Sequence, residues 1–233
     1  MRMTTEEIRA RLARPAVEFG TGGFRPGNVA TESWVGAVHL YAADEGLPLD
    51  EQGRPMWPLL QLVLPGLPLV PASLAATRVL TVFVSQDLPM DLAPNGRNWL
   101  LREYAHTQVL VGKQLLNPAS PFRPFPLRPR LIEQDFPVWD GGGVPDELAD
   151  EILALENDGV IDSYYDLVEN HHGHKLGGYP TFCQSGIEFS PGFEFVLQIA
   201  SDAKAHLNIV DGGTVFLAKN AATGEWEFYC DFS

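Results

Sequence analysis

The stretch HKLGGYP, residues 174–180, places two glycines and a proline directly after a charged residue. Glycine adopts positive φ and allows close approach of other atoms, and proline holds φ at about −65°. Clusters of Gly and Pro mark turns, so we expect Gly177, Gly178 and Pro180 to form a structural turn. The alternative is an anion-binding nest, but no helix with a phosphate-loop pattern follows the glycines.

A similar stretch, GTGGFRPG, occupies residues 20–27, and Gly22 and Gly23 are expected to form a matching turn. Each glycine pair is followed by an apolar segment containing Leu-Gln and then by one containing Val-Phe. The order predicts two copies of one β-rich unit, with Gln61 in the place of Gln198 and an insertion in the first copy at about 34–55. We expect each buried glutamine to tie its strand to the glycine-pair loop, since buried amides need partners. A ligand pocket with pseudo-twofold symmetry is the alternative.

The predicted fold class is α+β: internally duplicated β-rich units with antiparallel sheets and a few short helices. The 19 prolines and 22 glycines are scattered, which favours many short elements joined by turns. We expect a single domain over residues 1–233. Its two pseudo-repeats cover about 15–116 and 145–233, and a Pro-rich linker at 117–140 joins them.

Three short helices are predicted from local signals. Thr4 caps the first, Glu7 completes a capping box, and Pro15 ends it. The second begins with Pro145 at its first position and ends at Asp158-Gly159. Leu148, Ile152 and Leu155 recur on its inward face, and a third helix over 160–169 directs Ile161, Tyr165 and Val168 inward.

Negative charge is concentrated in one part of the chain. The net charge is −14, and residues 131–170 contain 12 carboxylates but no Lys or Arg. Such a protein is poorly suited to bind nucleic acid, whose phosphates need basic side chains, and is better suited to a basic partner. The alternative is a solvated face that maintains solubility.

Trp139 differs from the other four tryptophans, which are expected in the core. It lies in QDFPVWDGGG, residues 134–143, a composition typical of an exposed loop, and an exposed Trp beside acids resembles an interface hot spot. The predicted partner-binding surface therefore consists of Asp135, Trp139, Asp140, Asp146, Glu147, Asp150, Glu151, Asp158 and Asp162.

The segments HKLGGYP, EFVLQIASD and DGGTVFLAKN resemble the YwqG-like family of bacterial domains of unknown function. FGTGG, DEQGRPMWPLLQL and LTVFVSQ in the first half agree more loosely. The resemblance is weak in residues 87–145, where the basic, proline-rich stretch NPASPFRPFPLRPR has no counterpart. The resemblance implies an α+β fold with duplicated antiparallel sheet units and no accepted catalytic residues. Some members of that family resemble immunity proteins of polymorphic-toxin loci.

The stretch NHHGHK, residues 170–175, is the one metal-like cluster, with His171 and His174 close to Asp166 and Glu169. Zinc sites need three or four ligands at defined spacing, and the acidic surroundings would repel DNA, so we expect neither a metal nor nuclease chemistry. Motifs for a serine nucleophile elbow, a phosphate loop or a zinc protease are missing from the sequence. No cofactor is expected.

We therefore expect a non-enzymatic immunity protein that binds and neutralises a cognate basic toxin domain, such as a nuclease effector of a contact-dependent or type VI secretion system. Direct nucleic-acid or membrane contact is not expected. No run of 18 apolar residues and no secretory signal occurs, which favours the cytoplasm. The alternatives are a small-ligand-binding protein or enzyme using a pocket between the repeats, and a structural module.

Overall fold

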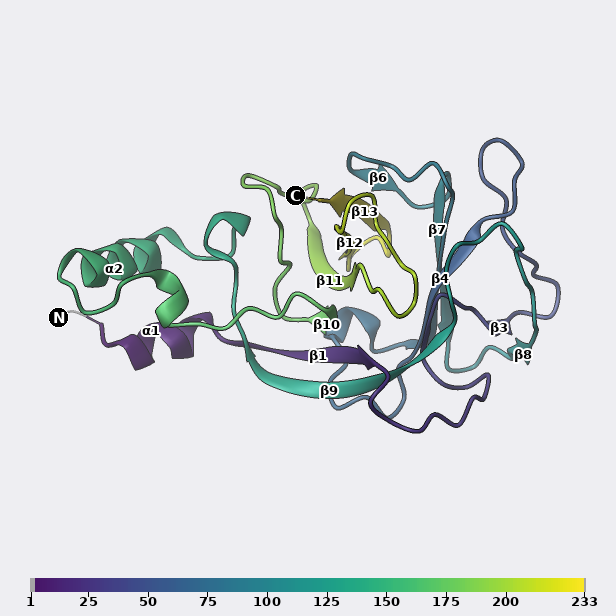
Figure 1. The fold of residues 1–233 in the computed structure, drawn as a ribbon, viewed down its shortest axis with the longest axis horizontal. Coiled ribbons are helices and arrows are strands. Elements are labelled where there is room, and N and C mark those ends of the chain that lie inside the picture. The colour runs from purple at the N-terminus through teal and green to yellow at the C-terminus, as the bar shows by residue number, and fades with distance from the viewer. Residues whose placement is uncertain (1–2, 233) are drawn as a thin grey trace.

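One large antiparallel sheet organises the protein, whose computed structural model describes residues 3–232. Within that range, eleven strands lie in the order β6-β13-β12-β11-β10-β1-β9-β2-β4-β5-β7, and every neighbouring pair is antiparallel. The sheet is strongly curled, so β4, β5 and β7 stand across from β11, β12 and β13 (Figure 1). The fold is mostly β with a little helix, as the sequence predicted at this level.

The strands of the large sheet are β1 (Arg14–Thr21), β2 (Trp34–Val35), β4 (Trp57–Val63), β5 (Thr77–Val84), β6 (Ala93–Pro94), β7 (Trp99–Ala105), β9 (Phe125–Asp135), β10 (His174–Gly177), β11 (Phe193–Ala200), β12 (Thr214–Asn220) and β13 (Trp226–Asp231). A second, two-stranded sheet pairs β3 (Leu40–Tyr41) with β8 (Val111–Gly112). β-Branched and aromatic residues are frequent in the long strands, because such residues pack well on a pleated surface.

The two long strands β1 and β9 form the centre of the sheet. They pair along most of their length, with Glu18 opposite Arg130. The stretch 117–140, which we predicted as a linker, therefore contains the longest strand of the sheet. Its prolines misled the prediction: Pro126 and Pro129 lie within β9, opposite Trp34 and Phe19. Proline has a φ compatible with a strand and lacks only the N–H donor.

Strands β1 and β9 also divide the sheet between the two halves of the chain. On one side of the centre, β1 pairs with β10 and leads to β11, β12 and β13. On the other side, β9 pairs with β2 and leads to β4, β5 and β7. Each half of the chain thus places its first long strand beside the strands of the other half.

Gln61 in β4 and Gln198 in β11 are fully buried and make corresponding hydrogen bonds. Each side-chain oxygen accepts a bond from a backbone N–H, and each nitrogen donates to a backbone carbonyl. The partners are Leu40 and Glu32 for Gln61, and Thr181 and Gly173 for Gln198. Both glutamines therefore tie a strand to the loops that flank the neighbouring strand, β2 or β10.

The register matches Gly177 with Gly36, not with Gly22 as we expected. Trp34 pairs with Gln61 as Lys175 pairs with Gln198, so the residues two positions further along the chain are Gly36 and Gly177. Their φ values are +72° and +75°. The distance along the chain from glycine to glutamine is then 25 residues in one half and 21 in the other, which leaves little of the predicted insertion.

The helices agree with the local signals in part. Helix α1 spans Thr5–Leu12 with the predicted capping box, and α2 spans Asp146–Asn157 with Pro145 as its N-cap rather than its first residue. Residues 160–169 form only a single 3₁₀ turn, Tyr164–Asp166. Ser163 and Asp166 cap this turn reciprocally, which fixes a turn too short to show the periodicity of an α-helix.

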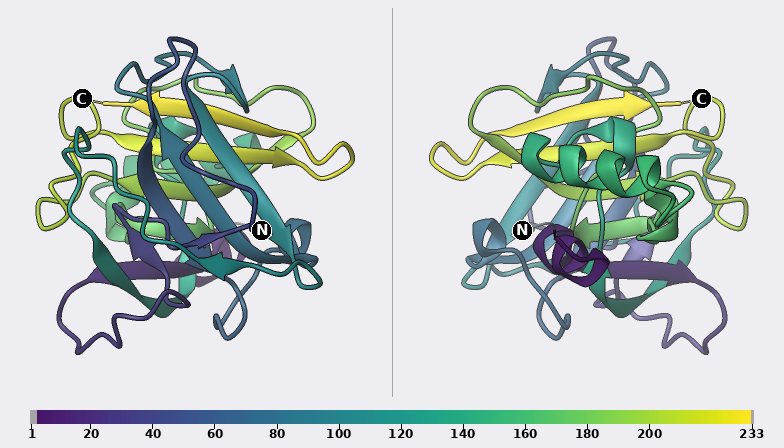
Figure 2. Two further views of the ribbon diagram at one scale, coloured as in Figure 1. Left: turned by 90° about the vertical axis from the view of Figure 1, so that its right-hand side faces the viewer. Right: turned by 90° about the vertical axis from the view of Figure 1, so that its left-hand side faces the viewer.

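Two of the five hydrophobic clusters among the described residues position the candidate site. The main core fills the space inside the curled sheet and receives side chains from both halves, including Trp99 and Phe228, whose rings lie 5.2 Å apart. The second core holds α1, α2 and the connecting segments together. We call residues 3–13 and 136–170 the helical lobe. Figure 1 shows it projecting beyond one end of β1 and β9, and the right-hand view of Figure 2 looks onto its two helices.

A short segment bridges the two edges of the curled sheet. Strand β6 pairs with β13, and the backbone N–H of Asn95 donates to Trp226 O. The Asn95 side chain exchanges two hydrogen bonds with the backbone of Leu101 in β7. In the part of the chain described, neither helix has the length and apolar character needed to cross a bilayer.

Candidate functional site

The helical lobe carries most of the residues that the sequence predicted for partner binding. Its two segments contain 12 carboxylates and two arginines. Five of the predicted side chains are exposed on α2 and its flanking loops: Asp140, Asp146, Glu147, Asp150 and Asp162. Asp158 is exposed as well, and Glu151 is half-buried and accepts a hydrogen bond from Met3 N.

Several of these carboxylates have no neutralising neighbour. Among the described residues, the side chains of Asp146, Glu147 and Asp150 form no hydrogen bond or ion pair. Glu156 lies in the last turn of α2, where the helix dipole disfavours negative charge, and no basic residue shares that turn. The negative charge of Glu156 therefore lowers the stability of α2.

Both arginines of the lobe, Arg9 and Arg11, lie in α1. Arg9 donates to Leu167 O and lies 5.0 Å from the centre of the Phe136 ring. Arg11 contacts the Met3 sulfur. Neither arginine forms an ion pair with the acids of α2, so the outer face of α2 stays negatively charged.

Asp135 does not belong to this surface, and its predicted role in partner binding is wrong. It is fully buried at the end of β9, where its Oδ2 lies 2.8 Å from the Nζ of Lys175, which is also fully buried. The same oxygen accepts a bond from Tyr179 N. Burial lowers the pKa of Lys175, while the Asp135 carboxylate opposes the shift. Asp135 thus ties the end of β9 to β10 and to the turn that follows β10.

Trp139 and Tyr165 exchange the positions that we predicted. Trp139 is half-buried in a 3₁₀ turn, Trp139–Gly141, and its ring lies 5.1 Å from that of Tyr164 in the lobe core. Tyr165, predicted to point inward, is 55% exposed and contacts Tyr164 edge-on. The prediction for Tyr165 was wrong because the neighbouring Tyr164 occupies the core position instead.

A cavity of about 410 Å³ lies in the lobe between α1 and the segment after α2. Arg9 and Asp166 contribute polar atoms, and Val160 and Leu167 contribute apolar surface. Val160 is 58% exposed and stands between Asp158 and Asp162 in sequence. An exposed apolar side chain, Val160, therefore lies beside this cavity between two carboxylate residues of the chain.

The predicted turn glycines adopt the conformation that needs glycine. Gly22 and Gly23 both have φ of +73°, and Gly177 and Gly178 have +75° and +68°. A Cβ on Gly178 would lie 2.2 Å from Asp135 Oδ2. Pro180, half-buried, then leads the chain away from the turn. The HKLGGYP turn thus wraps the buried carboxylate of Asp135.

The histidines of 170–175 do not form a metal site. His174 is buried, its Nδ1 accepts a bond from Ala200 N, and its Nε2 lies 3.6 Å from Asp202 Oδ2. The His174 imidazole, together with a bond from Thr21, holds the pKa of Asp202 below its usual range. Within residues 3–232, no three His, Cys, Asp or Glu side chains are placed to share a metal ion.

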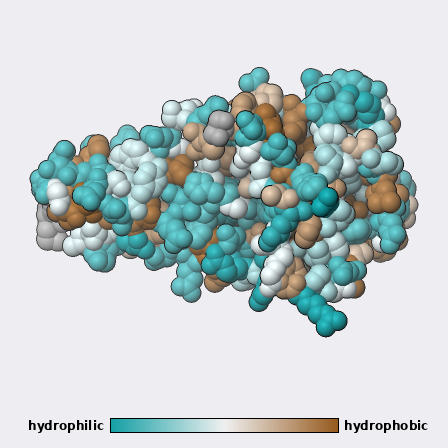
Figure 3. All heavy atoms as spheres, in the orientation of Figure 1, coloured by the Kyte–Doolittle hydropathy of each residue, from teal (hydrophilic) through white to brown (hydrophobic). Residues whose placement is uncertain are grey.

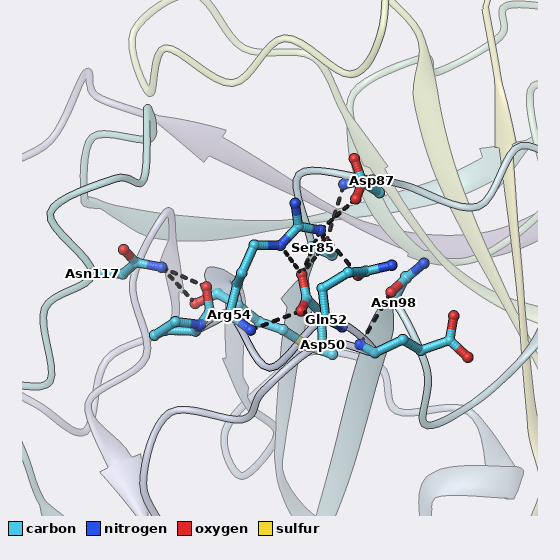
Figure 4. A network of polar contacts seen from close by, with 10 residues as sticks. Asp50, Gln52, Arg54, Ser85, Asp87, Asn98 and Asn117 are labelled. Carbon is cyan, nitrogen blue, oxygen red and sulfur yellow. Dashed lines mark hydrogen bonds and ion pairs between the residues drawn. The ribbon is translucent and has the colours of Figure 1, made fainter.

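A second polar cluster lies outside the lobe and joins several loops (Figure 4). The Asp50 carboxylate accepts bonds from the backbone and Nε of Arg54 and from Ser85 Oγ. Arg54 also pairs with Asp87. Burial works to raise the pKa of Asp50, but the hydrogen bonds from Arg54 and Ser85 outweigh it and lower the pKa to about 2. The cluster fixes the loop before β4 to the end of β5.

A further cavity, of about 680 Å³, lies between segments from both halves of the chain. Met90 and Leu92 come from the first half, and Ile187, Tyr229 and Cys230 from the second. Burial, with a smaller contribution from Asp231, raises the pKa of the Cys230 thiol to about 12, so the thiol is neutral at physiological pH. This cavity offers apolar contact rather than an activated nucleophile.

Comparison of the chain with models of protein families and with curated proteins gave no match.

Proposed function

We propose that this protein binds a basic partner protein through the outer face of the helical lobe and neutralises it, as an immunity protein neutralises a toxin. The observation that carries the proposal is the group of unpaired carboxylates on α2, set around exposed apolar side chains. Complementary charge steers encounter, and a desolvated aromatic anchor holds the complex. A nuclease domain fits this partner chemistry, because a DNA-binding surface is positive.

Two features support a binding role over a solvated face. Glu156 has negative charge at a helix end that disfavours it, which a merely soluble surface does not require. Tyr165, Val160 and Leu153 expose 55%, 58% and 43% of their surfaces on the same lobe. Large apolar side chains among like charges are the composition of an interface, with anchors inside a polar rim.

The proposal includes an ancestry for the fold. We infer that the chain is an internal duplication of the YwqG-like type, in which the first strand of each copy is exchanged. The corresponding bonds of Gln61 and Gln198 and the matched places of Gly36 and Gly177 support this inference. Trp99 and Trp226 also begin corresponding strands, β7 and β13.

The test uses the product of the neighbouring gene, which this proposal expects to be a toxin. Cells expressing that product alone should stop growing, and co-expression of this protein should restore growth. The variant Asp150→Lys/Glu156→Lys/Asp162→Lys should fail to protect. Its association rate with the toxin domain should fall about tenfold or more at low salt.

The matched control is Asp44→Lys/Glu194→Lys/Asp211→Lys. These acids are exposed elsewhere on the molecule, and the change in net charge is the same. The control should protect cells and should associate at nearly the wild-type rate. Equal loss in both variants would mean that only net charge matters, and retained binding in the lobe variant would disprove the proposal.

A further inference from the structure

We infer a second interaction site, separate from the helical lobe: a groove beside β13 that takes an extended peptide segment of a partner, apolar in the middle and basic at its ends. It does not depend on the proposed function. The groove is the cavity of about 680 Å³ between residues 90–92 and the segments 184–188 and 229–232. In Figure 3, hydrophobic atoms gather at the top of the molecule in this region, near β6 and the C-terminal end of the chain.

The edge of β13 is only partly covered. Its pairing with β6 comprises Glu227 with Pro94 and Phe228 with Ala93, and it does not extend further along β13. The carbonyl of Trp226 faces β6, since it accepts a bond from Asn95 N. Residues two apart in a strand face the same side, so the N–H and C=O of Cys230 point toward the groove.

No described segment pairs with that part of the edge. Asp91 would stand opposite Cys230 if the pairing continued, but the two form no β-pair, and Asp91 lines the groove instead. Within β13, Cys230 alone presents an N–H and a C=O at this part of the edge, and such unpaired groups bind an added strand through main-chain hydrogen bonds. An added strand in the groove would thus pair with Cys230 as β6 pairs with Phe228.

The side chains around this edge define the peptide. Apolar atoms come from Met90 and Leu92, which are 44% and 39% exposed, and from Ile187. The charged residues of the groove are Asp91 and Glu188, both exposed, and no Lys, Arg or His lines it. Alternating apolar side chains would enter the groove, and basic side chains at the ends would meet the two carboxylates.

A second copy of this chain is a weaker candidate for the groove. Each copy would bring Asp91 and Glu188 to the other, and like charges placed together at an interface are unfavourable. A partner with basic residues removes this repulsion. The geometry therefore points to a heterologous peptide segment.

The test uses three synthetic peptides with blocked termini. The first is Lys-Val-Thr-Val-Thr-Val-Lys, the second replaces both lysines with glutamate, and the third N-methylates the central residue to remove one N–H donor. Binding is followed through the backbone amide signals of the ¹⁵N-labelled protein. The lysine peptide should shift the Cys230 and Leu92 signals with a Kd of about 1 mM or tighter.

The glutamate peptide and the N-methylated peptide should each bind about tenfold more weakly, because each removes one of the two recognition elements. Asp91→Lys/Glu188→Lys should reverse the charge preference, and the exposed-site variant Glu133→Lys should leave it unchanged.

No shift with the lysine peptide would overturn the inference. Equal binding of the N-methylated peptide would also overturn it, since the groove would then be a simple apolar pocket. Sedimentation at increasing protein concentration tests the second copy: a dimer that the peptide dissociates would assign the edge to self-association. The variants of the helical lobe change residues outside the groove, so their results do not decide this test.

Discussion

Lys175 Nζ lies 2.8 Å from Asp135 Oδ2, and neither side chain is exposed to solvent. The pair joins β10 to the end of β9, where the sheet passes into the helical lobe. A buried charge without its partner is costly, whereas an apolar replacement of the whole pair is often tolerated. Asp135 Oδ1 also has no hydrogen-bond partner among the described residues.

Asp135→Ala should therefore destabilise the fold by about 3–5 kcal/mol, because it leaves the Lys175 charge buried and unpaired. Asp135→Leu/Lys175→Met, which removes both charges, should cost less than Asp135→Ala alone. Urea unfolding of the three proteins measures the difference. A double variant less stable than the single one would show that the pair contributes net stability.

Gly178→Ala should destabilise more than Gly23→Ala. Both glycines have positive φ, which costs an alanine about 1–2 kcal/mol. At Gly178 the new Cβ would also lie 2.2 Å from Asp135 Oδ2, whereas at Gly23 no atom lies within 4 Å. Thermal unfolding of the two variants gives the comparison, and equal losses would mean that the turn moves away from Asp135 at little cost.

Gln61→Ala and Gln198→Ala should destabilise by similar amounts, each about 3 kcal/mol, because each leaves buried N–H and C=O groups without partners. Gln86→Ala serves as control, since Gln86 is exposed and forms no hydrogen bond among the described residues. Chemical denaturation measures all three. A cost at only one of the two buried positions would contradict their equivalence.

Acid should unfold the protein partly through Asp50. Its pKa is about 2 in the folded state, below the ordinary value of 3.8. Such a group stabilises the fold fully above pH 3.8, and its contribution disappears as pH falls from 3.8 toward 2. Arg54→Gln removes a donor, so the variant should lose this pH-dependent stability. Arg97→Gln, at a 75% exposed arginine, should follow the wild-type curve between pH 2 and 5.

Tyr165→Ala and Trp139→Ala should separate binding from folding. Under the proposed function, loss of the exposed Tyr165 ring should weaken toxin binding by about 2 kcal/mol, mainly through faster dissociation. Loss of Trp139 should instead lower the melting temperature, because its ring packs on Tyr164 in the lobe core. Interface kinetics and calorimetry on both variants test this, and the reverse assignment would restore Trp139 as the anchor.

Local features were predictable from the sequence, and long-range pairing was not. The Thr4 capping box and the buried face of α2 follow from spacing over a few residues. That Gln198 is buried follows from its apolar neighbours. The position of β9 depends on partners more than 100 residues away, and its prolines resemble those of a linker.

The same limit explains the errors at the candidate site. Asp135 looked like one more acid of an exposed run, because its partner Lys175 lies 40 residues further along the chain. Trp139 and Tyr165 were exchanged because the lobe core selects Tyr164. Composition identified the charged surface of α2. It could not distinguish the exposed acids of that surface from Asp135, which is buried at the end of β9.

The central position of β1, between β9 and β10, sets the order in which a growing chain can complete its fold. Strand β1 leaves the ribosome first, yet its neighbours β9 and β10 end at residues 135 and 177. Until those residues are synthesised, β1 has two bare edges, which is the condition under which nascent chains aggregate. We therefore expect the N-terminal half to fold stably only once β9 and β10 are available to pair with β1.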